Sequence, residues 1–137
     1  MSQVGGRRIA VTGGRDHEPT LAELRAFHRL WVREGGGVLI HGDARGVDRF
    51  MGARAEAREI EVRKVPVDER LDGSWPGAGM ARNRRMLVQE RAEVLVAFPG
   101  NRGTAGCCRD ALRLGLPVWR WSPAAGDFAR VGGTDTL

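Results

Sequence analysis

Four short segments of the sequence combine glycine with arginine, aspartate or threonine in a way that suits the binding of an anion. They are residues 12–16 (TGGRD), 41–48 (HGDARGVD), 79–83 (GMARN) and 99–104 (PGNRGT), here called motifs 1 to 4. Glycine lets backbone N–H groups approach an oxyanion closely, because no Cβ atom stands in the way. A helix that begins after such a turn adds unpaired N–H groups and the positive end of its dipole.

Each motif also carries an arginine, whose guanidinium binds phosphate oxygens as a planar fork. One helix terminus contributes only about 0.3–1 kcal/mol to binding a charge, so we expect several motifs to converge on one site. The residues expected to line that site are Gly13, Gly14, Arg15, Asp16, Gly42, Arg45, Gly46, Asp48, Arg82, Asn83, Gly100, Asn101, Gly103 and Thr104. Simpler interpretations compete for single residues: a glycine that only makes a turn, Asp48 paired with Arg45 or Arg49, and Thr104 as a helix N-cap.

The elements that must position these motifs alternate between strand and helix. Short apolar runs predict strands at 9–11, 38–41, 62–67, 94–98 and 117–121, and helical spacing predicts helices at 20–34, 46–59, 80–91 and 104–114, with a loop at 68–79. This alternation predicts right-handed crossovers and hence an α/β fold, a Rossmann-like three-layer sandwich with a parallel sheet of about five strands in the order 3-2-1-4-5. Ligands bind such sheets beyond the carboxyl ends of the strands, and all four motifs are expected to converge on that edge.

Length and composition indicate the number of domains, the absence of disulfide and metal sites, and the location of the protein. The 137 residues suit one domain, expected over residues 1–121, followed by a flexible C-terminal tail over 122–137. The adjacent Cys107 and Cys108 and three scattered histidines predict neither a disulfide framework nor a metal site, and nothing predicts a cofactor. The absence of a long apolar run and of a signal-peptide core predicts a cytoplasmic protein without a membrane partner.

Several well-known signatures are absent. The sequence contains no GxxxxGK[ST], no GxGxxG after the first strand and no GxSxG. A P-loop nucleotide hydrolase, a standard dinucleotide fold and an α/β-hydrolase are therefore disfavoured. The net charge of +5, carried almost entirely by arginine, permits nucleic acid as a partner, but the sequence shows no basic stripe interleaved with aromatic residues.

The four motifs resemble the SLOG superfamily, in particular its YspA-like, YpsA-related branch. The resemblance covers about residues 8–121, through VTGGRD (11–16), HGDARGVDR (41–49), GMARNRRM (79–86) and FPGNRGTAG (98–106). It implies a Rossmann-like fold that binds nucleotides or nucleotide-derived ligands. It also implies dimers or higher homo-oligomers, for which the helices at 80–91 and 104–114 would supply the contact.

The superfamily includes LOG phosphoribohydrolases, which cleave nucleoside monophosphates at the glycosidic bond, and DprA-type DNA-binding proteins. The LOG pattern PGGxGTxxE would run over residues 99–107, but Asn101 stands at its second glycine and Cys107 at its catalytic glutamate. Cys107 cannot take over the role of that carboxylate. Asp16, Asp43 and Asp48 are the other acidic residues that could act as a base, so the sequence leaves open whether the protein is an enzyme.

Three hypotheses follow from the sequence. The first is a sensor or sequestering protein for a ligand such as ADP-ribose or another phosphorylated nucleoside, with phosphate held by the glycines and Thr104, charge supplied by the arginines, and Asp48 and Asn83 facing ribose hydroxyls or orienting arginine. The second is a nucleoside 5′-monophosphate phosphoribohydrolase-like enzyme that uses an aspartate. The third is a DprA-like nucleic-acid-binding protein.

Overall fold

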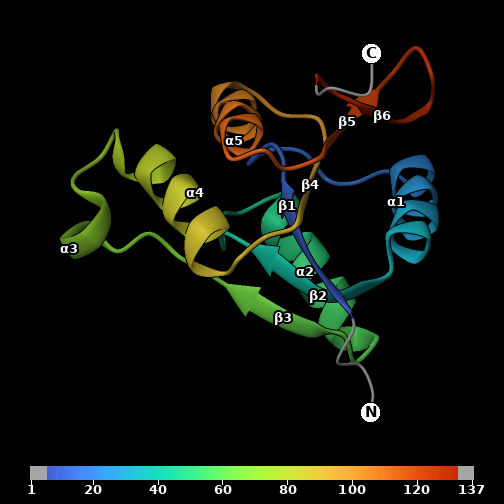
Figure 1. The fold of residues 1–137 in the computed structure, drawn as a ribbon, viewed down its shortest axis with the longest axis horizontal. Helices are drawn as coiled ribbons and strands as arrows, with labels where there is room; N and C mark the ends of the chain where they lie inside the picture. The colour runs from blue at the N-terminus through green and yellow to red at the C-terminus, as the bar shows by residue number, and fades with distance from the viewer. Residues whose placement is uncertain (1–5, 133–137) are drawn as a thin grey trace.

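Six strands form one sheet in the computed structural model, which describes residues 6–132 (Figure 1). The strands are β1 (Arg7–Thr12), β2 (Gly36–His41), β3 (Glu61–Lys64), β4 (Val94–Ala97), β5 (Val118–Ser122) and β6 (Asp127–Arg130). Their order is β3-β2-β1-β4-β5-β6, in which the first five are parallel and β6 is antiparallel to β5. The predicted α/β class and the order of the first five strands are therefore confirmed.

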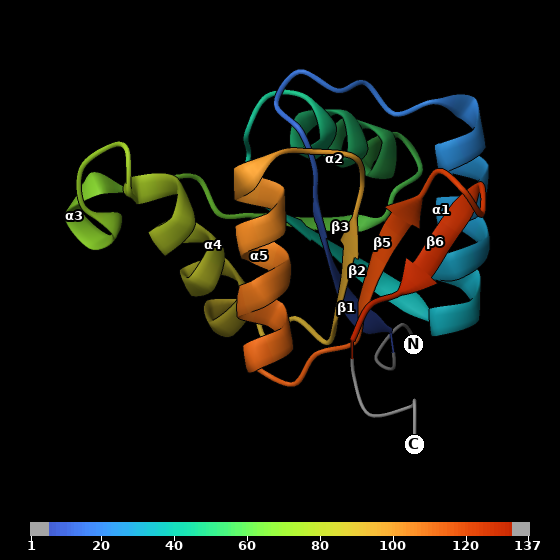
Figure 2. The ribbon, with the colours of Figure 1, turned by 90° about the horizontal axis from the view of Figure 1, so that it is seen from above.

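Helices cover both faces of the sheet and complete three layers (Figures 1 and 2). They are α1 (Leu21–Glu34), α2 (Val47–Ala57), the short α3 (Glu69–Asp72), α4 (Ala78–Gln89) and α5 (Arg102–Arg113). α1 and α2 pack on one face, and α4 and α5 pack on the other. α3 lies within the segment predicted as a loop at 68–79, and it packs beside α4 at the outside of the molecule (Figure 2).

The buried middle parts of β1 and β2 and the whole of β4 are apolar because both of their faces are covered. In β1, Ile9 and Val11 belong to the core under α1 and α2, whereas Ala10 belongs to the core under α4 and α5. The same alternation divides Val94 from Leu95 in β4. All five side chains are at most 1% exposed, so the parallel strands that end at the motifs are held rigidly from both sides.

Both ends of α1 carry helix-capping residues that are visible in the sequence. Thr20 is its N-cap, and it forms a capping box in which Thr20 Oγ1 accepts from the Glu23 N–H and the Glu23 carboxylate accepts from the Thr20 N–H. Gly35 ends the helix in the left-handed region, with φ of 69°. Gly36 already belongs to β2.

The prediction of a flexible tail over 122–137 is wrong for residues 122–130, which end β5 and form β6. Ser122 ends β5, and a turn follows in which Ser122 Oγ accepts from the Ala125 N–H at 3.2 Å. The chain then returns as β6 and buries Phe128 against Trp121 and Phe98, with ring centroids 5.2 and 5.1 Å away. One isolated phenylalanine in a polar, glycine-rich segment gave no alternation to reveal the strand, but its burial holds the hairpin to the sheet. Residues 133–137 of the predicted tail lie outside the described part of the chain.

Candidate functional site

The carboxyl ends of β1, β2 and β4 bring motifs 1, 2 and 4 into direct contact. The Gly14 N–H donates to the Pro99 carbonyl oxygen at 2.8 Å, so motif 1 is bonded to motif 4. The Gly14 carbonyl oxygen accepts from the Val47 N–H at 3.2 Å, so motif 1 is also bonded to motif 2 at the start of α2. The expected convergence of these three turns is thus seen in the backbone itself.

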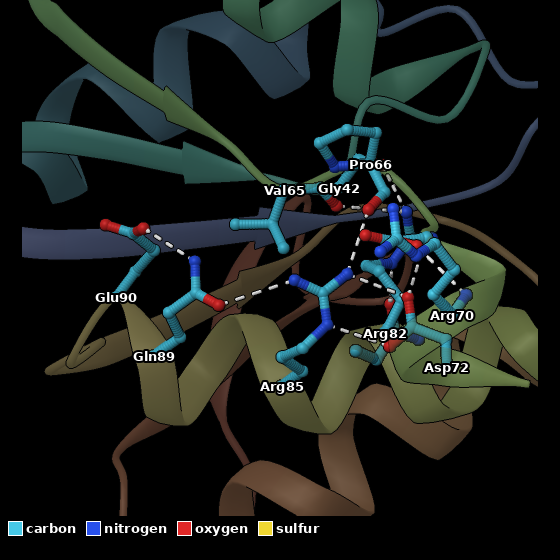
Figure 3. A network of polar contacts seen from close by, with 11 residues as sticks. Gly42, Val65, Pro66, Arg70, Asp72, Arg82, Arg85, Gln89 and Glu90 are labelled. Carbon is cyan, nitrogen blue, oxygen red and sulfur yellow. Dashed lines mark hydrogen bonds and ion pairs between the residues drawn. The ribbon is translucent and has the colours of Figure 1, made fainter.

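Motif 3, in the first turns of α4, closes the arrangement. Arg82 Nη1 donates to the Gly42 carbonyl oxygen of motif 2, as Figure 3 shows. Asn83 Nδ2 lies 3.5 Å from the Gly103 carbonyl oxygen of motif 4, a long hydrogen bond. The four motifs therefore form a closed ring of hydrogen bonds, which runs from motif 1 to 4, 3, 2 and back to 1. We call it the motif ring.

Close packing explains why glycine is required at two positions of the motif ring. Gly46, the N-cap of α2, has φ of 82°, and a Cβ atom there would lie 2.6 Å from the Arg15 carbonyl oxygen. A Cβ atom on Gly100 would lie 2.8 Å from the Gly14 nitrogen and would also collide with Thr104 Oγ1. Gly103 is different, since nothing outside its own helix lies within 4 Å of the Cβ position.

Two helix N-termini at the motif ring lack side-chain caps. Gly46 is the N-cap of α2 and Asn101 is the N-cap of α5, and neither residue makes a side-chain capping bond. Among residues 6–132, the N–H groups of the first turn of α5, from Arg102 to Thr104, have no hydrogen-bond acceptor. Such a turn offers several donors and a positive dipole end to an anion.

Asp48 is the buried carboxylate of the site, with only 6% of the residue exposed. Its Oδ2 accepts from the backbone N–H groups of Gly42 and Ala44, at 3.0 and 3.3 Å. Burial raises the pKa of Asp48 to about 6, and these two hydrogen bonds together with the positive Arg82 oppose that rise. The other oxygen, Oδ1, accepts no hydrogen bond from the described residues. It is therefore the atom that a ligand hydroxyl or a water could use.

Arg82 forms its hydrogen bonds within the protein and does not extend into solvent. It is 8% exposed, and it donates from Nε to Asn83 Oδ1 at 2.9 Å and from Nη1 to the carbonyl oxygens of Gly42 and Val65 (Figure 3). Burial lowers its pKa, and the negative charge of Asp48 opposes this. Arg82 and Asn83 therefore join β2, the end of β3, α4 and α5, and their clearest role is to position the motifs.

The remaining arginines of the motifs lie at the surface. Arg45 Nη2 is 2.9 Å from Asp16 Oδ1, but both side chains are more than half exposed, so the pair adds little stability. Arg15 and Arg102 are exposed and form no ion pair with residues 6–132. These two guanidinium groups are free to meet an anion.

Thr104 and Cys107 are two buried residues in the first half of α5. Because α5 begins at Arg102, Thr104 is its third residue rather than its N-cap; it is 3% exposed and turns its hydroxyl toward Gly100. Cys107, one turn later, is fully buried, and burial raises the pKa of its thiol to about 12. At neutral pH this thiol stays protonated, so it cannot act as a base.

Two features of the site escaped the sequence analysis. His41, at the end of β2, is 3% exposed and accepts from the Asp43 N–H through Nδ1 at 2.9 Å; burial lowers its pKa and favours the neutral ring. Its place at a strand end, two residues before an aspartate, was the only available signal. Arg85 forms an ion pair with Asp72 that anchors α3 (Figure 3), and their separation across a loop gave no signal at all.

α1 carries a basic stripe that does not belong to the motif ring. Arg25, Arg29 and Arg33 are exposed and recur every four residues, about 6 Å apart along the helix. Arg33 also lies over the Trp119 ring, 5.1 Å from its centroid. The stripe is thus assembled with an aromatic residue from β5. Such a stripe was not expected from the sequence, and binding of nucleic acid, which the sequence did not favour, stays the third hypothesis.

Two absences hold for residues 6–132. No three histidine, cysteine, aspartate or glutamate side chains come close enough together to hold a metal ion. None of the helices in this part of the chain has the length and apolar character needed to cross a membrane. The sequence matches no protein-family model and no curated protein.

Proposed function

We propose that the motif ring binds the phosphate of a nucleotide or nucleotide-derived ligand, such as ADP-ribose or a nucleoside phosphate, and that the protein senses or sequesters this ligand. The observation that carries the proposal is the closed ring of hydrogen bonds through four motifs. It fixes the free N–H groups at the start of α5 beside the turns that follow β1 and β2. The resemblance to the SLOG superfamily supports the same class of ligand.

The donors near the start of α5 suit a phosphate group in particular. Its first-turn N–H groups point out of a helix N-terminus, and Gly103 leaves open space beside them. The exposed Arg102 lies in the same turn, and Arg15 lies on the neighbouring motif 1. A phosphate here would receive both backbone and guanidinium hydrogen bonds, and a charge-assisted hydrogen bond contributes roughly 1.5–3 kcal/mol.

Asp48 gives the proposed site an acceptor as well as donors. Its Oδ2 is held by two backbone N–H groups while Oδ1 is left without a partner among the described residues. A carboxylate held in this way is suited to accept hydrogen bonds from the hydroxyl groups of a ribose. Phosphate donors and a ribose acceptor at one site favour a nucleotide over inorganic phosphate.

The experiment is a thermal-shift and calorimetric titration with ADP-ribose, AMP and inorganic phosphate. A ligand present at 100 times its Kd stabilises the fold by about 2.7 kcal/mol, so we expect ADP-ribose or AMP to raise the Tm by several degrees. Arg102→Gln should weaken binding about tenfold or more. Arg109→Gln is the matched control, because Arg109 is also exposed on α5 but lies two turns further along the helix. If neither nucleotide raises the Tm, or if both variants lose affinity equally, the proposed site is wrong.

Hydrolysis is the second candidate function, and Asp48 is the observation that favours it. A buried carboxyl with a pKa near 6 is suited to take up a proton at physiological pH. Chromatography of AMP incubated with the protein separates the two functions. Binding without release of adenine supports sensing, whereas adenine release that Asp48→Asn abolishes would establish hydrolysis instead.

A further inference from the structure

Residues of α1 and α2 enclose a hollow on the face of the sheet that α4 and α5 do not cover. It is a cavity of about 50 Å³, partly open to solvent. Its apolar lining includes the buried Phe27, Leu39 and Met51 and the partly buried Ile60. Arg54 and Arg58, one helical turn apart on α2, also line it.

The cavity is separate from the motif ring. None of its lining residues belongs to motifs 1 to 4. Arg58 is the C-cap of α2 and Ile60 immediately precedes β3, so this part of the cavity lies toward the amino end of that strand. The motif ring is built at the carboxyl ends of the strands, so the two sites can be tested independently.

The two arginines of the cavity lack negative partners. Neither Arg54 nor Arg58 forms an ion pair within residues 6–132, and Arg58 Nη1 makes one long hydrogen bond, 3.4 Å, to the carbonyl oxygen of Arg54. Arg54 is half-buried; burial and the positive charge of Arg58 lower its pKa. Like charges four residues apart on a helix repel each other, and an anion bound between them would offset that repulsion.

We propose that this cavity binds a short-chain aliphatic carboxylic acid, with its hydrocarbon chain against Phe27, Leu39 and Met51 and its carboxylate against Arg54 and Arg58. An apolar wall with charged groups at one end is the general form of a small-ligand site. Arginine pairs with carboxylate through two parallel hydrogen bonds. The small volume of the cavity favours a short hydrocarbon chain, and benzoate, whose hydrocarbon part is longer and wider than that of butyrate, tests this limit.

The test is an NMR titration of the whole protein with sodium butyrate, which follows the indole signal of Trp31 and the methyl signal of Met51. Both residues line the cavity. We expect saturable shifts of these signals at millimolar butyrate. Butanol lacks the charge, acetate lacks the chain, and benzoate is too large, so each should bind at least several-fold more weakly.

The variants test the role of the two cations. Arg54→Gln and Arg58→Gln should each weaken butyrate binding about tenfold. Arg25→Gln is the matched control, because Arg25 is exposed on α1 and does not line the cavity; its affinity should equal that of the wild type. Equal affinity in all three variants, tighter binding of benzoate, or no saturable shift at all would overturn the proposal. Arg102→Gln should leave butyrate binding unchanged, so failure here is distinguishable from failure of the proposed nucleotide site.

Discussion

Arg85 and Asp72 form an ion pair through two hydrogen bonds, from Nε to Oδ1 at 2.8 Å and from Nη2 to Oδ2 at 2.7 Å (Figure 3). Arg85 Nη2 also donates to the Pro66 carbonyl oxygen at 3.0 Å. The pair therefore ties α3 and the segment after β3 to α4, the helix that carries motif 3. Its hydrogen bonds lower the pKa of Asp72 to about 2, although burial works in the opposite direction.

Asp72 should consequently make stability depend on pH in the acid range. Its pKa is lower in the folded protein than its ordinary value of 3.8, so the contribution is complete above that value and is lost as the pH falls toward 2. Asp72→Asn should lower the free energy of unfolding by about 2 kcal/mol at pH 7. Urea denaturation of both proteins measures this, and the difference between them should shrink as the pH approaches 2. A difference that does not vary with pH would contradict the assignment.

Asp48 should make stability depend on pH in the opposite direction. Its folded pKa of about 6 lies above its ordinary 3.8, so the stability that it contributes is complete below pH 3.8 and is lost as the pH rises through 6. Asp48→Asn removes this burial cost, and it should raise the free energy of unfolding at pH 7 by up to about 3 kcal/mol while it weakens ligand binding. Asp16→Asn is the control, because that side chain is 83% exposed and should change stability little. Loss of both stability and binding in Asp48→Asn would show that Asp48 is structural only.

Gly46→Ala should be more costly than a left-handed backbone alone can explain. Gly46 and Gly115 have almost the same φ, 82° and 81°, but a Cβ atom on Gly46 would press against the Arg15 carbonyl oxygen while Gly115 faces open space. Gly115→Ala measures the cost of a positive φ in open space, roughly 1–2 kcal/mol. Gly46 also has ψ of −129°, outside the left-handed helical region, which adds to its backbone cost. Gly46→Ala should lose at least about 1 kcal/mol more in thermal or urea denaturation. Equal losses would mean that motifs 1 and 2 can separate without penalty.

The sequence was informative where a residue's role depends on its near neighbours. The apolar runs at β1, β2 and β4 predicted buried parallel strands, and the glycine-rich turns predicted their meeting place. β6 was missed because its main contribution is one phenylalanine, Phe128, which packs against Trp121 in the neighbouring strand and against Phe98, a residue distant in the sequence. The burial of individual arginine side chains could not be predicted from the sequence either. Nothing in the spacing of Arg82 and Arg102 shows that the first is enclosed and the second exposed.

Arg82→Lys should be strongly destabilising although it keeps the positive charge. The guanidinium bonds Asn83 from Nε and Gly42 from Nη1, and a lysine, with a single side-chain nitrogen, cannot span the two acceptors in this way. Disruption of a buried charged network costs about 3–5 kcal/mol. Arg84→Lys, on the exposed side of the same helix, should change the free energy of unfolding by less than about 0.5 kcal/mol. Urea denaturation of the two variants decides between a structural and a purely ligand-binding role for Arg82.

The antiparallel hairpin made by β5 and β6 has a consequence for how copies of the protein can meet. It gives the sheet one edge at β6, with Asp127 and Arg130 exposed, and leaves the other at β3, with Glu61, Arg63 and Lys64 exposed. Charged side chains on edge strands discourage edge-to-edge aggregation between sheets. Self-association at high concentration should therefore not extend the sheet. It would have to use helical surfaces instead, such as the outer side of α4, where Met80 and Val88 are exposed.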